Sequence, residues 1–192
     1  GYDHQFGKNR EGGIEFLNSI CSKFNFTVKE IPAEEINEVN ISSTRIRNEI
    51  ENGDISKANK YLGEPFTLNG IVVKGEQLGR KIGFPTANVF IDDETKIIPS
   101  NGVYAVKAFI EKGQEIQGMM NIGVRPTVSE ALRTSVEVNL FDFNEDIYTK
   151  QIEISILSKL RDEQKFENIE ALISQLKNDE KICRNYYQSL SI

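Results

Sequence analysis

The most informative segment of this chain is Val72–Asn88, which reads VVKGEQLGRKIGFPTAN. The nine residues Gly75–Gly83 contain three glycines, with Arg80 and Lys81 between the second and the third. These glycines are Gly75, Gly79 and Gly83. Glycine lets backbone N–H groups turn toward an anion and lets a phosphate approach closely, while the two cations add positive charge. A long hairpin loop would explain the glycines equally well, so a phosphate-binding loop needs support from the residues that follow.

That support comes from Thr86 and Asn88, two oxygen-bearing side chains directly after Pro85. Residues two apart on an extended segment point to the same side, as a shared Mg²⁺–phosphate site requires. Mg²⁺ takes few protein ligands and completes its octahedron with water and phosphate oxygens. Taken alone, a Thr and Asn pair in a strand is more often a turn or edge feature.

From residue 66 onward the chain consists of short β-rich runs separated by turn residues. The expected strands are Phe66–Lys74, Thr86–Ile91, Val103–Glu111, Glu115–Ile122, Thr134–Phe143 and Ile147–Leu157. Tight connections at Glu111–Gln114 and Asn144–Asp146 predict hairpins and therefore antiparallel pairing. Six such strands indicate a closed β-barrel, which leaves no exposed sheet edge.

The C-terminal tail returns to helical spacing. One apolar face carries Ile169, Leu172, Ile173 and Leu176, and another carries Ile182, Tyr186 and Leu190. We expect these C-terminal helices to cover part of the barrel.

The first third of the chain follows an α/β pattern. Apolar residues at helical spacing predict a helix over 14–24, and alternation predicts a strand over 26–31. Two short helices follow, the first carrying Ile46 and Ile50. Their predicted caps and stops are Ser42 or Ser43, Gly53, Asp54 and Gly63. Helical spacing gives way to β-rich runs at Gly63-Glu64-Pro65, which predicts two domains, residues 1–63 and 64–192.

Composition narrows the function classes without choosing one. The 192 residues are 39% hydrophobic and carry a formal net charge of −6, which disfavours a broad nucleic-acid surface because phosphate backbones need clustered Lys and Arg. The two cysteines, Cys21 and Cys183, form no C-x-x-C pair, so neither a disulfide framework nor a zinc site is indicated. No apolar run approaches the roughly 20 residues that span a bilayer. We therefore expect a cytoplasmic protein that binds neither nucleic acid nor membrane.

The segment Gly79–Asn88 resembles the signature of riboflavin kinases. The resemblance covers about residues 64 to 190. Further matching motifs, in the family's order, are Gly102–Tyr104, Asn121–Thr127, Glu137 with Asp146–Tyr148, and Leu160–Glu163. The resemblance implies a mainly β fold with added helices: a six-stranded antiparallel Greek-key barrel with a helical cover.

The resemblance also implies substrates and residue roles. ATP would phosphorylate riboflavin to FMN, Thr86 and Asn88 would hold the Mg²⁺–nucleotide, and Glu137 would be the catalytic base. The residues implied in ligand binding are Gly75, Gly79, Arg80, Lys81, Gly83, Pro85, Thr86, Asn88, Arg125 and Arg161, the last in a mobile loop near the flavin. Without the resemblance, Glu137 would be read as the solvent face of an alternating strand. Many members carry His where this chain has Asn139, which keeps hydrogen bonding but loses titration near neutrality.

The N-terminal part resembles the end of the FMN adenylyltransferase domain of bacterial bifunctional enzymes. The resemblance rests on Gly1–Gly7 and Ile41–Arg47. In the second motif the implied nucleotide-binding residues are Ser43, Thr44 and Arg47, at a helix start that suits phosphate. The domain's His-bearing H-x-G-H motif is missing, since His4 is the sole histidine. We therefore expect the first half of a Rossmann-like domain to be absent, and this chain by itself to make no FAD.

Two other functions are compatible with the barrel. One is a flavin- or nucleotide-binding barrel without catalysis, which a substitution of Glu137 separates from a kinase. The other is an OB-like barrel that binds single-stranded nucleic acid, since small barrels host unrelated functions; the acidic balance opposes this reading.

Overall fold

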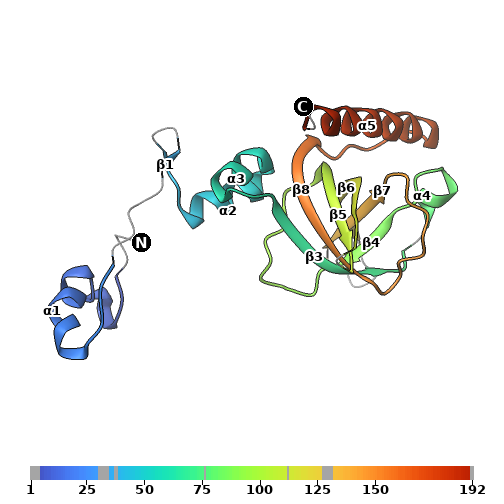
Figure 1. Ribbon diagram of the computed structural model, residues 1–192. Helices are drawn as coiled ribbons and strands as arrows, with labels where there is room; N and C mark the ends of the chain where they lie inside the picture. Colours follow the sequence, from blue (N-terminus) through green and yellow to red (C-terminus); the bar gives the residue numbers. More distant parts are fainter. Residues whose placement is uncertain are drawn as a thin grey trace. The chain divides into compact units, whose positions relative to one another are not determined.

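A computed structural model describes residues 5–29, 35–36, 39–75, 77–111, 113–126 and 132–190. The chain forms two compact units, Gly1–Ser43 and Thr44–Ile192 (Figure 1). The boundary predicted between residues 63 and 64 separates two family domains rather than two compact units, and it stays a prediction.

The first unit contains few regular elements. They are the 3-10 turn η1 (Lys8–Arg10), helix α1 (Ile14–Phe24) and the two-residue strands β1 (Glu35–Ile36) and β2 (Val39–Asn40), which pair antiparallel. The predicted helix over 14–24 is confirmed. The predicted strand over 26–31 is wrong for residues 26–29, which pair with no described strand and follow Asn25 in a left-handed conformation; residues 30 and 31 lie outside the described part. The elements are too few to show a Rossmann-like layer, which therefore stays a prediction.

Two short helices precede the barrel with the predicted stops. Helix α2 (Ser43–Asn52) ends at Gly53, whose φ is 81°. Helix α3 (Ile55–Leu62) begins after Asp54, whose side chain accepts a hydrogen bond from the Lys57 amide at 3.3 Å, and ends at Gly63 with φ 80°. Both stops need the left-handed backbone that glycine adopts without strain.

The amide side chain of Asn59 joins helix α3 to the barrel through hydrogen bonds. Asn59 donates through Nδ2 to the Ile156 carbonyl at 2.8 Å and accepts through Oδ1 from the Phe66 amide at 2.8 Å. Ile55 and Ala58 on the same helix are fully buried. The helix therefore packs on the first and last strands of the barrel.

Six strands form the predicted closed barrel. They are β3 (Phe66–Val73), β4 (Ala87–Phe90), β5 (Gly102–Ile110), β6 (Glu115–Pro126), β7 (Leu132–Leu140) and β8 (Gln151–Arg161), in the order β3-β4-β7-β6-β5-β8. All pairs are antiparallel. Strand β4 precedes the hairpin-connected run β5-β6-β7, and the last strand of that run, β7, returns to pair with β4, which is a Greek key. The hairpin predicted at Glu111–Gln114 is confirmed by the β5–β6 ladder.

The hairpin predicted at Asn144–Asp146 is wrong. Strand β7 pairs with β4 and β6, whereas β8 pairs with β3 and β5. The turn therefore crosses from one side of the barrel to the other, because closing the barrel requires β8 to fill the gap between β3 and β5.

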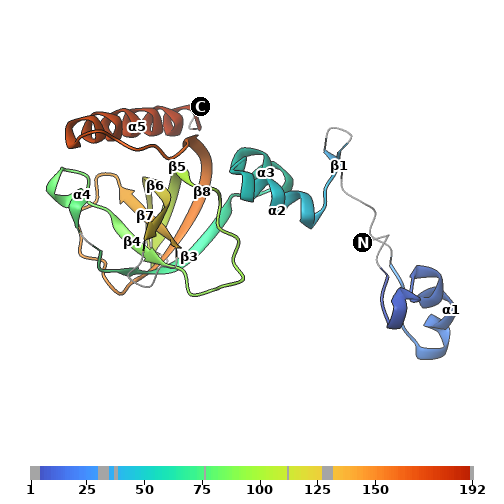
Figure 2. The same cartoon turned by 180° about the vertical axis from the view of Figure 1, so that it is seen from behind.

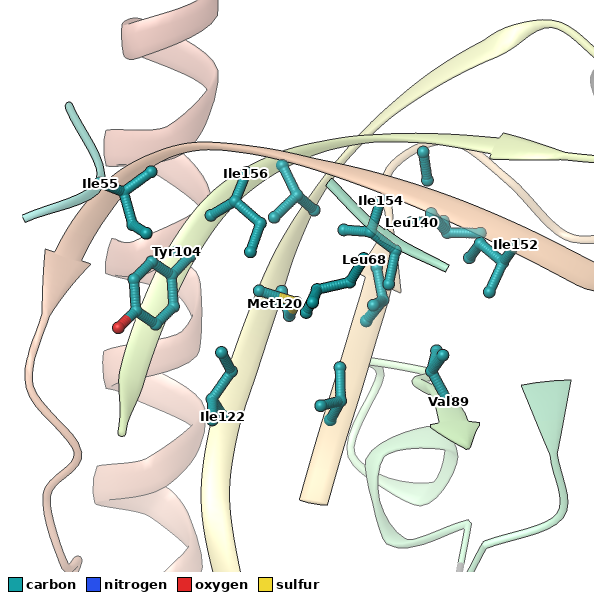
Figure 3. Packing of buried hydrophobic residues seen from close by; sticks show 14 of the residues in the cluster. Ile55, Leu68, Val89, Tyr104, Met120, Ile122, Leu140, Ile152, Ile154 and Ile156 are labelled. Atoms are coloured by element: carbon teal, nitrogen blue, oxygen red, sulfur yellow. The ribbon is translucent and has the colours of Figure 1, made fainter. Parts of the chain in front are cut away.

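The barrel interior holds the main apolar core (Figure 3). Side chains such as Leu68, Met120 and Ile154 are fully buried there and point into the interior of the barrel. Alternate residues of each strand must then face outward, since the side-chain period of a strand is two. This alternation places the polar residues of β4, β6 and β7 outside.

A single long helix, α5 (Ile169–Leu190), covers one outer side of the barrel, as expected for the tail (Figure 2). It packs on a second buried cluster that contains Met119, Phe141, Cys183 and Tyr187. The Tyr187 hydroxyl donates to the Gly118 carbonyl at 2.7 Å. The second predicted face is wrong for Ile182 and Leu190, which are exposed, because the buried face runs through residues 179, 183 and 187. Tyr186, the third residue of that face, is partly buried and packs against the cluster.

Candidate functional site

Three polar side chains meet on the outer face where β4, β7 and β6 lie side by side. In register, Asn88 stands opposite Glu137, and Glu137 stands opposite Asn121. Their strand neighbours Val89 and Val138 are buried in the barrel core. The sheet therefore brings an amide, a carboxylate and a second amide into one row.

Thr86, directly before β4, joins this row. Its hydroxyl Oγ1 donates to Glu137 Oε2 at 3.3 Å. Thr86, Asn88 and Glu137 are all half-buried. The predicted metal ligands and the predicted base are therefore brought together by the fold.

The glycine-rich loop packs directly against this row. It carries the short helix α4 (Leu78–Lys81), and the Phe84 amide donates to the Gly79 carbonyl at 2.8 Å. A Cβ on Gly75 would lie 2.2 Å from the Asn88 amide nitrogen, and one on Gly79 would lie 2.3 Å from the Phe84 carbonyl oxygen. A side chain at residue 79 would therefore collide with backbone, and one at residue 75 would displace the Asn88 amide. Gly83 is required for a different reason, since its φ is 87°.

Two cavities adjoin the row, and Thr86 lines both. The first, about 340 Å³, is bounded by Arg80, Pro85 and the turn between β7 and β8. The second, about 320 Å³, is bounded by Asn88, Glu137 and α5. Gln77 also lines both cavities and donates to the Tyr148 hydroxyl at 3.2 Å, which ties the glycine-rich loop to that turn.

Arg161 lines the second cavity and is held by a buried carboxylate. Its Nε lies 3.0 Å from each oxygen of Asp179, and its Nη2 lies 2.7 Å from Asp179 Oδ2. Asp179 is 1% exposed, and it also accepts a hydrogen bond from Gln175 at 2.7 Å. Arg161 is thus the last residue of β8, and its side chain forms an ion pair with Asp179 of α5.

The other predicted site residues are distributed unevenly. Arg80 lines the first cavity, whereas Lys81 is exposed and lines neither cavity. The backbone of Arg125 belongs to β6, but its side chain lies outside the described part, as do His4 and Gly1–Asp3. The predicted residues of the second nucleotide motif line neither cavity: Ser43, Thr44 and Arg47 are exposed on the first turn of α2. Helices α2 and α3 lie on the opposite side of the barrel from α4 (Figures 1 and 2).

The donors in the row fit a magnesium ion. Thr86, Asn88 and Glu137 offer hydroxyl, amide and carboxylate oxygens, which are the hard ligands that Mg²⁺ takes. Among the residues that the structure describes, no group of three or more His, Cys, Asp or Glu side chains could hold a metal. Three protein ligands would leave the remaining positions of an Mg²⁺ octahedron to water and phosphate oxygens.

Sequence reasoning missed several residues of the site. Asp179 carries no local signal except a polar side chain on an otherwise apolar helical stripe, and it is explained only by Arg161. Asn139 was mentioned only because many family members carry His at its position. It is 7% exposed, and its Nδ2 donates to the Pro85 carbonyl at 2.7 Å. Asn121 was noted only as part of a motif, and the strand register gives it a place beside Glu137.

Family comparisons match the chain in two segments. The family described as riboflavin kinase matches residues 62–187, and the family described as FAD synthetase matches residues 1–45. The chain is 39% identical over 193 aligned positions to a bifunctional riboflavin kinase/FMN adenylyltransferase of Bacillus subtilis, with 99% of this chain covered. It is 36% identical over 187 positions to the protein of the same description from Escherichia coli K12. The chain spans about 60% of the length of these curated relatives.

A solved structure agrees with the fold. A crystal structure described as a macrolide-efflux protein from Streptococcus pneumoniae superposes with a TM-score of 0.85 at 38% identity, covering 96% of this chain and 58% of that one. In the described part of the present chain, none of the helices is long and apolar enough to cross a membrane.

Proposed function

The chain belongs to the riboflavin kinase family, and we propose on that premise that its barrel transfers the γ-phosphate of ATP to the 5′-hydroxyl of riboflavin, giving FMN and ADP. One observation carries the proposal: Thr86 stands in a wall shared by two cavities, one of which is also lined by Arg80 and the other by Glu137. Phosphoryl transfer needs donor and acceptor held in line on either side of the moving group.

The cavity beside Arg80 suits the nucleotide. Gln77 and Arg80 of the glycine-rich loop line it, and the Arg80 guanidinium would neutralise phosphates there. Its walls include Pro85, Phe143 and Tyr148, which are not fully buried and offer an apolar surface to a base. The γ-phosphate would then lie toward Thr86.

The cavity beside Glu137 suits the flavin. Its apolar lining consists of Leu78, Ile82, Phe84, Val103, Met119, Phe166, Leu172 and Leu176. A planar tricyclic ring gains from such a surface, while its polar ribityl chain needs a hydrogen-bonding end. Glu137 supplies that end next to the shared wall.

The chemistry divides among residues of the row. Thr86 and Asn88 would hold a Mg²⁺ ion, which supplies charge neutralisation to the phosphates when bound. Glu137 accepts the proton of the riboflavin 5′-hydroxyl as that oxygen bonds to the γ-phosphorus. The bond from the γ-phosphorus to the bridging oxygen breaks, and its electron pair leaves on ADP. The half-buried position of Glu137 beside the Thr86 hydroxyl orients the carboxylate for this role.

We also propose that the intact protein adenylylates FMN to FAD, as the names of its relatives say of them. The match of residues 1–45 to the FAD synthetase family supports this second activity. A cytoplasmic location is proposed with it, since both cysteines are free thiols.

The direct test is to incubate the purified chain with riboflavin, ATP and Mg²⁺ and to separate the flavins. FMN should accumulate, and omission of the metal should abolish it. Thr86→Val should lower turnover on the order of 10²-fold by losing a ligand at the shared wall. Thr134→Val is the matched control, because Thr134 is exposed on β7 and lines neither cavity. No FMN from the folded wild-type chain would refute the proposed function.

A further inference from the structure

Asn139 is a buried polar residue that the phosphoryl-transfer scheme above does not use. It follows Glu137 by two positions on β7 and shares its outward direction, since Val138 between them is fully buried in the barrel core. Asn139 is only 7% exposed. A buried amide requires a hydrogen-bond partner, so the choice of partner reports on its role.

That partner is the residue before Thr86. The paired register of β4 and β7 runs as far as Ala87 and Val138, and no ladder pair is formed beyond it. At the next position, Asn139 Nδ2 donates to the Pro85 carbonyl oxygen at 2.7 Å. The side chain thus continues the attachment of the two strands past the point where the backbone ladder stops.

The contacts close a ring around the shared wall of the two cavities. Asn139 holds Pro85, Pro85 precedes Thr86, and Thr86 Oγ1 donates to Glu137 Oε2 at 3.3 Å. On the other side, the Phe84 amide is held by the Gly79 carbonyl at 2.8 Å. The segment 84–86 is therefore fixed from the glycine-rich loop and from β7 together.

We propose that Asn139 is a positioning residue for phosphoryl transfer: its amide holds the Pro85 carbonyl and thereby sets Thr86 against Glu137. The inference rests on the proposed function for the meaning of Thr86 and Glu137. A carbonyl oxygen only accepts, so any side chain in this role must present a hydrogen-bond donor, which Asn139 does through its amide N–H. Because the amide of Asn is neutral, its hold on Pro85 does not titrate.

The test measures steady-state riboflavin phosphorylation by the full chain carrying Asn139→Leu, which keeps the size and removes the donor. We expect kcat to fall about 10- to 100-fold, the cost of one lost buried hydrogen bond expressed in the transition state. Riboflavin affinity, followed by quenching of flavin fluorescence, should stay within about threefold, because the eight apolar side chains that line that cavity are kept and Asn139 contributes a single polar group to its lining.

Rescue separates positioning from a purely structural role. Asn139→His restores a ring N–H near the position of the lost amide N–H, and the adjoining cavity of about 320 Å³ leaves room for the larger ring. This variant should recover most of the turnover lost by Asn139→Leu. If Asn139→Leu fails to fold, Asn139→Asp takes its place, since a carboxylate of the same size cannot donate.

A double-mutant cycle tests the route through Thr86. In a Thr86→Val background, Asn139→Leu should lower kcat by less than about threefold further, because the group that it positions is already gone. Wild-type turnover in Asn139→Leu, no rescue by His, or full additivity with Thr86→Val would each overturn the proposal. Loss of activity in Thr86→Val with an unaffected Asn139→Leu would overturn it while leaving the proposed function standing. Full activity in Thr86→Val would instead contradict the proposed function.

Discussion

Asp179→Asn should destabilise the barrel unit by about 3 kcal/mol. The Asp179 side chain is 1% exposed, and three distances of 3.0, 3.0 and 2.7 Å join it to Arg161. Breaking a buried pair by neutralising one partner costs about 3–5 kcal/mol, since the other charge is left without compensation. The Arg161 side chain is 19% exposed and can recover some hydration, which places the cost at the lower end of that range.

The assay is reversible unfolding in urea together with thermal unfolding. A loss of about 3 kcal/mol corresponds to a fall in Tm of roughly 6–12 °C for a unit of this size. The matched control is Glu180→Gln, one position along α5, where a carboxylate 32% exposed meets Arg184 at 2.9 Å. Exposed pairs contribute at most about 1 kcal/mol, so the control should change Tm little.

A second arm separates the ion pair from helix packing. Replacing both partners, Asp179→Leu with Arg161→Met, removes both charges and should return stability to within about 1 kcal/mol of the wild type. Equal effects of Asp179→Asn and Glu180→Gln would refute the reasoning, because the burial of Asp179 would then carry no energetic weight.

Three further outcomes are expected. Gly75→Ala should lower kinase turnover on the order of 10²-fold, because the new Cβ would stand 2.2 Å from the Asn88 amide nitrogen. Gly13→Ala is the control, because a Cβ on Gly13 would meet nothing within 4 Å. Equal activities of the two variants would contradict the packing of the loop on Asn88. Burial raises the pKa of the Cys183 thiol from 9.0 to about 11. As pH rises, the thiol of the unfolded chain therefore loses its proton before the thiol of the folded chain does. The free energy of unfolding should fall by about 2 kcal/mol between about pH 9 and pH 11. Cys183→Ala should remove that part of the slope in pH-dependent urea unfolding, and an unchanged slope would count against it. The purified chain should convert riboflavin to FMN but form no FAD from FMN and ATP, and an FAD peak on chromatography would show the expectation to be wrong.

Local signals in the sequence were sufficient for the six strands and for helices α2 and α3, whereas the short helix α4 inside the glycine-rich loop was not predicted. Short β-rich runs between turn residues located all six strands, and the capping side chain of Asp54 and the glycines at 53 and 63 located the ends of two helices. These features work because each is decided within a few residues, by side-chain direction or by φ.

Pairing between distant segments was beyond local reading. The turn at Asn144–Asp146 has the composition of a hairpin, yet its two flanking strands have no pairing with each other. The strand order is decided by closure of the barrel, which the turn does not encode. The face of α5 was misassigned for the same kind of reason, since Asp179 is buried by a partner 18 residues away.

The candidate site shows the same division. Thr86, Asn88 and Glu137 were chosen from the family resemblance, and the strand register explains why they meet. The roles of Asn139 and Asp179 depend on contacts to Pro85 and Arg161 that only the folded chain creates. Polar residues with distant partners were therefore the hardest to predict.

The central claim is that the Glu137 carboxylate takes the proton of the riboflavin hydroxyl at the wall shared by the two cavities. Single-turnover phosphorylation by Glu137→Gln, with riboflavin affinity measured in parallel, tests it most directly. Glu153→Gln serves as control, because Glu153 is exposed on β8 and lines neither cavity. The rate of Glu137→Gln should fall on the order of 10²–10⁴-fold with flavin affinity kept and the control unchanged. A rate within about threefold of the wild type would show that another group is the base.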